Sequence, residues 1–110
     1  MKKLFVSLPM KGRTKEEIIS NIEKMKKAAE LLEGEELELI DSHIEVNPSK
    51  DSKESIFFLG ESIKKMAQSD VFIGLYDTDY YTDCTIEKMV AQSYDIKYYL
   101  LPQKYVIEKE

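Results

Sequence analysis

The sequence predicts an α/β fold in which a parallel sheet is covered by helices on both faces. Short apolar segments alternate with amphipathic segments of helical period along the chain. The segment 70–76, DVFIGLY, is apolar almost without interruption, as strands buried on both faces of a parallel sheet are. A chain of 110 residues is long enough for one core, so we expect a single domain spanning residues 1–110.

The first strand is expected over residues 3–8, KLFVSL, because this apolar run ends at Pro9. A helix follows, since Thr14 and Glu17 have the spacing of a capping box and Gly34 supplies a helix end. Between these ends, apolar side chains recur at helical spacing, at Ile18, Ile22, Met25, Ala29 and Leu32.

The middle of the chain contains a second strand, a long loop and a second helix. The apolar residues of segment 37–40 predict the strand, and the polar segment 42–53 predicts a loop of a length that is often functional. A helix over about 53–68 follows, with Asp51 or Ser52 as its N-cap. Its inner face is expected to carry Ile56, Leu59, Ile63, Met66 and Ala67.

The last part of the chain contains one more helix between strands. Segment 70–76 is the most apolar strand, and the polar loop 77–83, ending in a helix cap, leads to a helix over about 84–94. Two short strands, 97–101 and 105–107, complete a sheet of about four or five strands. Right-handed crossovers favour the flavodoxin-like order 2-1-3-4-5, a Rossmann-like three-layer sandwich.

Composition and charge exclude several classes of function. Lys and Arg number 16 against 21 Asp and Glu, and this net charge of -5 argues against binding to duplex nucleic acid. No apolar run approaches the roughly 20 residues that span a bilayer, and the N-terminus lacks a signal-peptide pattern. The single cysteine, Cys84, fits a reducing compartment. We therefore expect a cytoplasmic protein with a small-molecule ligand and no membrane partner.

Ligands of such sheets bind at the carboxyl ends of the strands, near the switch point between the first and third strands. This rule selects three loops, 7–13, 41–53 and 76–87. The first loop carries Lys11 and Arg13 just before a helix N-terminus, which suits a phosphate or carboxylate. An ordinary loop with solvated cations has the same composition, so both interpretations stay open.

The third loop combines acidic and tyrosine side chains, namely Asp77, Asp79, Asp83, Glu87, Tyr76, Tyr80 and Tyr81. The carboxylates lack the register of a calcium loop, and the sequence predicts no metal site and no cofactor. Glu87 falls in the first turn of the expected helix, where the helix dipole favours an ionised carboxylate. Such a carboxylate can attack a sugar carbon, or it can simply stabilise the helix end. The tyrosines suit stacking on a base.

Two further side chains have both a chemical and a structural interpretation. His43, the only histidine, lies near the switch point and suits an acid or base, although a histidine in a polar loop is more often without a role. Cys84 lies near a helix N-terminus, which can lower the pKa of a thiol, although a lone thiol usually only packs.

Four segments share the pattern of one enzyme family. They are KLFVSLPMKGRTKEEI, the pair Asp41-Ser42, FFLGESIKKMAQSDVFIGL and DCTIEKMVAQSYDIKYYLL. Together they resemble the nucleoside 2-deoxyribosyltransferase superfamily, especially its short relatives in bacteria and phages. The family motif (Y/F)-hydrophobic-(S/A)-G-P-M corresponds to residues 5–10, and the family's nucleophilic glutamate, in a Gly-x-x-x-Glu setting, corresponds to Glu87, with Asp83 at the glycine position.

The resemblance implies a reaction and a set of site residues. Glu87 is expected to attack the anomeric carbon of a nucleoside, release the base and pass the glycosyl group to another base or to water. Asp83 or Asp79 is expected to protonate the leaving base. The expected substrate-binding residues are Ser7, Pro9, Met10, Lys11, Arg13, Asp41, Ser62, Tyr76 and Tyr81.

Three positions depart from the family pattern. Phe5 replaces a tyrosine that orients the nucleophile, Ser62 replaces an aspartate of the second helix, and Tyr81 replaces the acid that protonates the base. Without a general acid, cleavage loses a contribution of roughly 10²- to 10⁴-fold. Two alternatives therefore stay open: a non-catalytic module that binds and sequesters a signalling nucleotide, and a partner-binding domain whose acidic loop is only a solvated rim.

We expect the protein to form a homodimer or a larger homo-oligomer. Pockets in the family it resembles are commonly completed by a neighbouring subunit, and a chain of 110 residues leaves little to close a pocket. Light scattering at high micromolar concentration should give at least twice the monomer mass. A monomer under these conditions would contradict the expectation.

Overall fold

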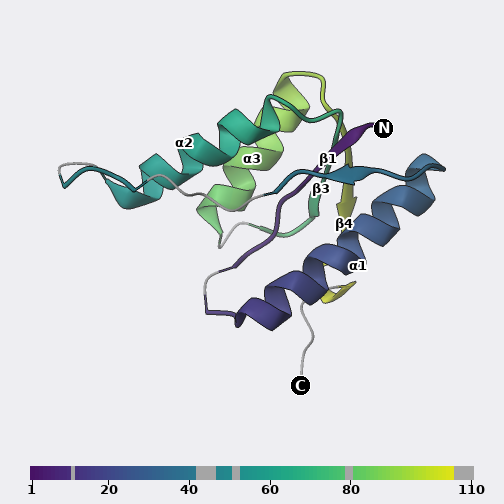
Figure 1. Ribbon diagram of the computed structural model, residues 1–110, viewed down its shortest axis with the longest axis horizontal. Helices are drawn as coiled ribbons and strands as arrows, with labels where there is room; N and C mark the ends of the chain where they lie inside the picture. The colour runs from purple at the N-terminus through teal and green to yellow at the C-terminus, as the bar shows by residue number, and fades with distance from the viewer. Residues whose placement is uncertain (11, 42–46, 51–52, 79–80, 106–110) are drawn as a thin grey trace.

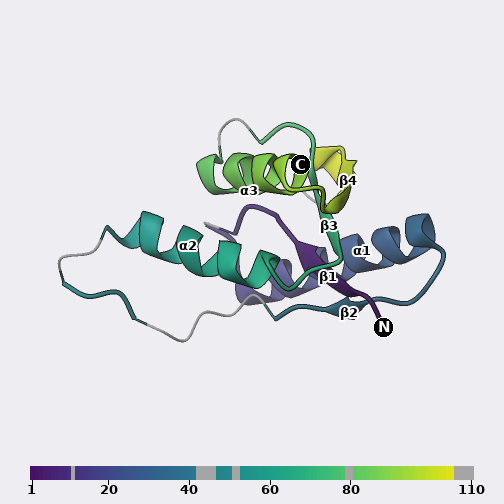
Figure 2. The ribbon, with the colours of Figure 1, turned by 90° about the horizontal axis from the view of Figure 1, so that it is seen from above.

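Four parallel strands form one sheet in the spatial order β2-β1-β3-β4, and helices cover both of its faces (Figure 1, Figure 2). The computed structural model describes residues 1–10, 12–41, 47–50, 53–78 and 81–105. The elements are β1 (Lys3–Val6), α1 (Lys15–Glu33), β2 (Glu38–Leu39), α2 (Glu54–Met66), β3 (Val71–Leu75), α3 (Thr82–Ser93) and β4 (Lys97–Leu101). The predicted α/β class is confirmed.

Strands β1 and β3 lie at the centre of the sheet. β1 pairs with β3 in parallel, with Phe5 opposite Phe72, and with the short edge strand β2 on its other side. β4 pairs with β3 along its full length and forms the other edge. Because all four strands run in the same direction, the loops that follow β1 and β3 leave the sheet at the same edge.

The predicted fifth strand does not form in the described part of the chain. After Pro102, residues Gln103–Tyr105 form a short 3-10 helix, and residues 106–107 lie outside the described residues. Tyr105, the first residue of the predicted strand, belongs to this 3-10 helix. The predicted order 2-1-3-4-5 is therefore observed as 2-1-3-4.

Each face of the sheet has its own core. On one face, α1 packs Met25, Ala28 and Ala29 against the strands. On the opposite face, Phe5 and Phe72 pack with Met66 of α2 and Ala91 of α3. Figure 1 shows α1 on one side of the strands and α2 with α3 on the other. None of the helices in the described ranges has the length and apolar character that a membrane span needs.

The inner face predicted for α2 is only partly correct. Met66 is buried and Ile63 is half-buried, but Ile56 is 65% exposed and Ala67 is the exposed C-cap. The ribbon shows the reason, because the N-terminal half of α2 extends beyond the edge of the sheet and only its C-terminal half lies over the strands (Figure 1). Apolar residues near the start of α2 therefore have no strand beneath them.

The helix ends follow local signals where a capping side chain is present. Thr14 and Glu17 form the predicted capping box, with hydrogen bonds of 3.1 and 2.9 Å, and Gly34 ends α1 in the left-handed conformation at φ 78°. Helix α3, in contrast, begins at Thr82, earlier than predicted, with Tyr81 as an N-cap that makes no side-chain cap hydrogen bond. Asp83 is therefore inside the first turn, and Glu87 lies in the second turn.

A buried carboxylate joins three elements at the amino ends of the strands. The side chain of Glu33, at the end of α1, is 1% exposed. It accepts hydrogen bonds from Tyr99 at 2.6 Å, Lys2 at 2.9 Å and Lys97 at 3.0 Å. These donors, foremost the Tyr99 hydroxyl, lower the pKa of Glu33 to about 2. The cluster fastens α1 to the start of β1 and to β4.

The aromatic contact between the central strands requires a glycine. The rings of Phe5 and Phe72 stack across β1 and β3 with their centroids 5.9 Å apart and an interplanar angle of 9°. A Cβ atom added to Gly74 would lie 2.9 Å from Cε1 of Phe72, closer than such contacts allow. Gly74 therefore leaves the space in which the Phe72 ring supports Phe5.

The substitution Gly74→Ala should lower the free energy of unfolding by about 1–3 kcal/mol, because the Phe72 ring must move to admit the new methyl group. The matched control is Gly60→Ala, since nothing lies within 4 Å of the Cβ position of this glycine. Removing a helix-interior glycine should raise stability by up to about 1 kcal/mol. Urea denaturation measures both variants, and a Gly74→Ala protein as stable as the wild type would contradict the packing argument.

Candidate active site

A cavity of about 460 Å³ lies at the carboxyl end of β1, walled by parts of α2 and α3. β1 and the loop after it contribute residues 5–10, and α2 contributes Ser55, Phe58 and Ser62. The start of α3 contributes the remaining part of the wall, Tyr81, Thr82, Asp83, Cys84 and Glu87. A volume of this size falls in the range of roughly 300–1,000 Å³ that small-molecule sites occupy.

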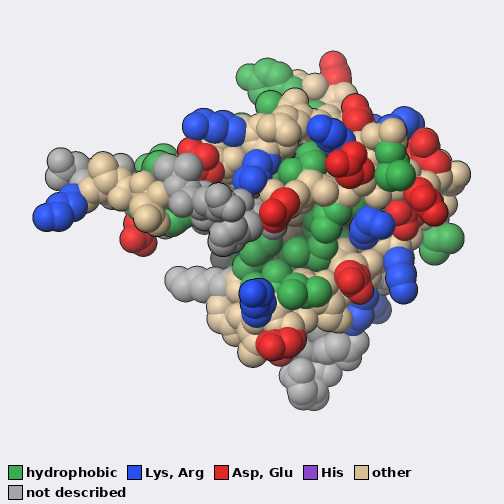
Figure 3. Space-filling view, viewed as in Figure 1, with side chains coloured by type: hydrophobic (Ala, Val, Ile, Leu, Met, Phe, Trp, Pro, Cys, Tyr) green, Lys and Arg blue, Asp and Glu red, His purple; other side chains and the backbone are tan. Residues whose placement is uncertain are grey.

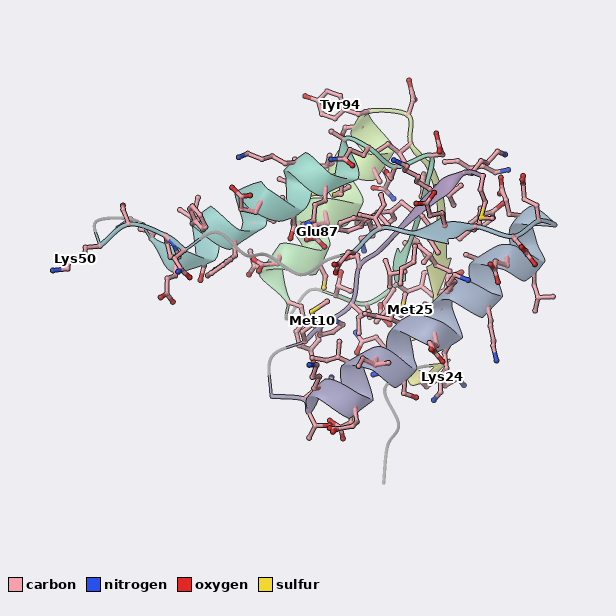
Figure 4. The ribbon with its side chains drawn as sticks, in the orientation of Figure 1. Met10, Lys24, Met25, Lys50, Glu87 and Tyr94 are labelled. Atoms are coloured by element: carbon pink, nitrogen blue, oxygen red, sulfur yellow. The ribbon has the colours of Figure 1, made fainter. Side chains whose placement is uncertain are left out.

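Glu87 is the centre of the polar part of the cavity. Its residue is 7% exposed, and its Oε1 atom accepts a hydrogen bond of 2.6 Å from the hydroxyl group of Ser7. Ser62 lines the same cavity, and its hydroxyl group favours the ionised form of this carboxylate. Figure 4 shows Glu87 on α3, next to α2 and the end of β1. Three elements that are distant in sequence therefore meet at one carboxylate.

Strand geometry determines the direction of the Ser7 side chain. The backbone N–H of Ser7 donates to the carbonyl oxygen of Ile73 at 2.9 Å, which continues the pairing of β1 with β3 beyond the last residue of β1. Successive side chains along a strand point to opposite faces of the sheet. Phe5 faces α2 and α3, Val6 faces α1, and Ser7 faces α2 and α3 again.

The loop after β3 is fastened to α3 by hydrogen bonds. The Lys88 ammonium group donates to the carbonyl oxygen of Tyr76 at 2.9 Å, and the Thr85 hydroxyl group donates to the carbonyl oxygen of Thr78. The backbone N–H of Tyr81 donates to that same Thr78 oxygen at 2.8 Å. Thr78 is 1% exposed, so the loop is anchored by a buried residue that fixes where α3 begins.

Burial dominates the electrostatics of Glu87. It raises the pKa of this carboxyl group to about 7, with a smaller contribution in the same direction from the charge of Asp83. The hydrogen bonds from Ser7 and Ser62 act against this rise, because hydroxyl donors stabilise the ionised carboxylate. The expectation that the helix dipole keeps Glu87 ionised is therefore wrong, since Glu87 lies one turn beyond the start of α3, where the dipole effect has declined.

Cys84 lines the same cavity as a neutral thiol. Burial, together with the nearby charge of Glu87, raises the pKa of Cys84 to about 11, although a hydrogen bond with Ser7 acts in the other direction. A lowered pKa, one of the two interpretations that the sequence allowed, is therefore contradicted. The thiol belongs to the packing of the cavity wall and is not an activated nucleophile.

Seven of the predicted site residues line the cavity. They are Ser7, Pro9, Met10, Ser62, Tyr81, Asp83 and Glu87. Three others that the structure describes, Arg13, Asp41 and Tyr76, are not part of its wall. Tyr76 is 55% exposed, and it lies one residue beyond the end of the fully buried strand β3. Asp41 follows β2 at the sheet edge, one strand away from the cavity.

Several residues singled out from the sequence lie outside the described residues. They are Lys11, Ser42, His43, Asp79 and Tyr80. Within the described ranges, no group of three or more His, Cys, Asp or Glu side chains is arranged to hold a metal ion. Asp83 is therefore the described carboxylate that shares the cavity with Glu87.

Sequence reasoning missed the contribution of α2 beyond Ser62. Ser55 and Phe58 also line the cavity. Together with Ser62 they lie three and four residues apart along α2, a spacing that places all three side chains on one helical face. The sequence does contain this pattern, which is an aromatic residue between two small hydroxyl residues. The apolar residues of α2 predict a different inner face, so they do not point to it. Phe5, noted only as a departure from a family pattern, also lines the cavity.

No protein-family model, curated protein or solved structure matches this chain. The chemistry of the cavity therefore has to be derived from its own residues.

The substitution Glu87→Gln should raise the free energy of unfolding at pH 8 by on the order of 3 kcal/mol. The folded-state pKa of Glu87, about 7, lies above the ordinary value of 4.5 for this group, so the folded protein binds this proton more tightly than the unfolded chain. The stability that protonated Glu87 contributes is therefore complete below pH 4.5 and is lost as the pH rises through 7. Urea denaturation between pH 4 and 8 should show the variant and the wild type converging at the acidic end.

Glu33→Gln is the matched control, because the pKa of Glu33 is lowered instead of raised. This variant should be less stable than the wild type at neutral pH. Its deficit should shrink as the pH falls from 4.5 toward 2, where Glu33 becomes protonated. Equal stabilities of Glu87→Gln and the wild type at pH 8 would contradict the raised pKa of Glu87.

Proposed function

We propose that the cavity binds a nucleoside or nucleotide and that Glu87 cleaves its N-glycosidic bond, with transfer of the glycosyl group to water or to another base. The observation that carries this proposal is the buried carboxylate of Glu87, which accepts a hydrogen bond from Ser7 in the wall of a ligand-sized cavity that Ser62 also lines. A carboxylate held in one orientation beside a bound sugar is well placed for nucleophilic attack. The resemblance to nucleoside 2-deoxyribosyltransferases favours the same chemistry.

In this mechanism a bond from Glu87 to the sugar replaces the bond to the base. One oxygen of the ionised carboxylate attacks the anomeric carbon, and the carbon–nitrogen bond breaks with its electron pair leaving on the base. Asp83 lies four residues before Glu87 and lines the same cavity, and in its protonated form it can pass a proton to the leaving base. Water or a second base then attacks the same carbon, gives its proton to the Asp83 carboxylate and releases Glu87. Carboxyl pairs that work in this way are separated by roughly 5 Å.

The two serine hydroxyl groups compensate for a departure from the family pattern. Phe5 has no hydroxyl group with which to orient Glu87, and its ring is 3% exposed and stacked on Phe72. Ser7 donates to the carboxylate instead, and the Ser62 hydroxyl group in the same cavity also favours its ionised form. Both are neutral groups, so they give the nucleophile none of the strong stabilisation that a cationic partner would.

A second candidate function is ligand binding without turnover. The raised pKa of Glu87, about 7, leaves a substantial part of the protein with a protonated carboxyl group near neutral pH. A protonated carboxyl group donates a hydrogen bond to a ligand but is a poor nucleophile. A module of this kind would bind a nucleotide and sequester it. The homo-oligomer expected from the family resemblance fits both candidate functions, since a neighbouring subunit would cover the cavity mouth.

The wild type should release free base from at least one member of a panel of ribonucleosides, 2′-deoxyribonucleosides and their 5′-monophosphates. Glu87→Ala and Glu87→Gln should lower this rate by roughly 10³-fold or more, because each removes the nucleophile. The rate should increase from pH 6 to pH 8 as Glu87 ionises, and liquid chromatography of the released base measures it. Ser62→Ala should move the acidic limb of this profile to higher pH, whereas Ser20→Ala on the exposed face of α1 should leave it unchanged.

Thermal denaturation with the same panel separates the two candidate functions. A ligand present at 100 times its Kd stabilises the folded state by about 2.7 kcal/mol whether or not it is cleaved. Stabilisation without base release would replace the catalytic proposal with the binding module. If no panel member stabilises the protein and none is cleaved, both candidate functions are contradicted.

A further inference from the structure

We propose that the ring of Phe58 on α2 is the surface on which the heterocycle of the ligand stacks, and that Phe58 therefore supplies affinity for the base. This inference rests on the proposed nucleoside function and adds the residue that recognises the leaving group. It starts from the arrangement of three side chains along α2.

Helix α2 lines the cavity with a row of side chains that leads away from the reacting carboxylate. Ser62 lines the cavity together with Glu87, and Phe58 and Ser55 lie on the same face of the helix toward its N-terminus. The rise of an α-helix places Phe58 about 6 Å and Ser55 about 10 Å along the axis from Ser62. The row therefore begins at the nucleophile and passes the aromatic ring before it reaches the exposed Ser55.

The chemistry of a nucleoside fits this row. Its base is attached to the carbon that Glu87 attacks, so a sugar bound with this carbon against Glu87 has its base one bond away. The polar atoms of Ser7, Ser62 and Glu87 lie at one end of the row, where the sugar hydroxyl groups need partners. An aromatic ring lies next along it, where a flat heterocycle needs a stacking surface.

The other aromatic rings singled out from the sequence are less suited to this role. Phe5 lines the cavity but is 3% exposed, and its ring is already stacked on Phe72. Tyr76 lies outside the cavity wall. Tyr81 lines the wall as the N-cap of α3 and does not belong to the row of α2 side chains that begins at Ser62. Phe58 is half-buried, and the ring of Phe57 contacts it edge to face at a centroid distance of 5.3 Å and an angle of 85°.

Phe57 provides a matched control for the experiment. Both rings belong to the same aromatic pair and both are half-buried, but only Phe58 is part of the described cavity wall. Phe58→Leu and Phe57→Leu each remove one ring of the pair and keep an apolar side chain. The probes are 2′-deoxyadenosine and thymidine, together with 2-deoxyribose as a ligand without a base, and titration calorimetry measures binding.

Phe58→Leu should weaken binding of at least one nucleoside by about tenfold and leave binding of 2-deoxyribose unchanged. Phe57→Leu should change nucleoside binding by less than about twofold, and Phe58→Tyr, which keeps the ring, should restore it. Equal losses in the two leucine variants, or no loss in Phe58→Leu, would overturn the inference. The same holds if neither nucleoside binds to the wild type.

The base-release assay keeps this result separate from the proposed catalysis. If nucleosides bind through Phe58 but are not cleaved, the catalytic function fails and the stacking role stands. If nucleosides are cleaved in a manner that depends on Glu87 while Phe58→Leu binds them normally, the stacking role fails and the catalytic function stands.

Discussion

Parallel pairing between β1 and β3 is the constraint on which the rest of the structure depends. Both strands lie at the centre of the sheet, and Val71, Phe72 and Ile73 of β3 are completely buried. A sheet of this kind needs helices on both faces, which α1 on one side and α2 with α3 on the other provide. The same pairing carries Ser7 past the end of β1 to Ile73, next to the turn that leads into α3. The pairing of β1 with β3 therefore determines both the core and the position of the cavity.

Two buried carboxylates lie at opposite ends of the parallel strands, and their surroundings shift their pKa values in opposite directions. At the amino ends of the strands, Glu33 is surrounded by two lysines and a tyrosine hydroxyl group, and its pKa is lowered. At the carboxyl ends, Glu87 accepts a hydrogen bond from the Ser7 hydroxyl group and has no cationic partner among the described residues, and burial raises its pKa. The first carboxylate stabilises the folded state near neutral pH and the second destabilises it. An unfavourable buried charge in a cavity is typical of a functional site, whereas a fully paired one is typical of structural reinforcement.

On the face seen in Figure 3, Lys and Arg alternate with Asp and Glu, as on an ordinary solvated surface.

The parts of the fold that local sequence determines were predictable. The capping box at Thr14 and Glu17, the helix end at Gly34 and the strand 97–101 were predicted where the structure has them. The start of α3 was not, because Tyr81 caps the helix without a side-chain hydrogen bond and leaves no local signal. Glu87 was identified as a candidate from its place after the third strand and from the family resemblance. Its raised pKa depends on burial by β1 and α2, elements that only the folded chain brings to it. Phe58 was missed for the same reason, since the sequence does not show which face of α2 turns toward a cavity.

Helix α2 is only partly buried against the sheet, and this has a consequence for the energetics of the cavity. This helix buries only Met66 completely, near its C-terminal end, whereas α1 buries four residues, Asn21, Met25, Ala28 and Ala29. Local opening is cheapest where few apolar groups are buried, so the N-terminal half of α2 belongs to the least protected part of the described fold. A ligand that contacts both Glu87 and α2 must then restrict the fluctuations of that helix, and part of its binding free energy is lost as conformational entropy. Affinity in this cavity is therefore coupled to the rigidity of one wall, and a substitution that stiffens α2 far from the ligand would tighten binding without touching it.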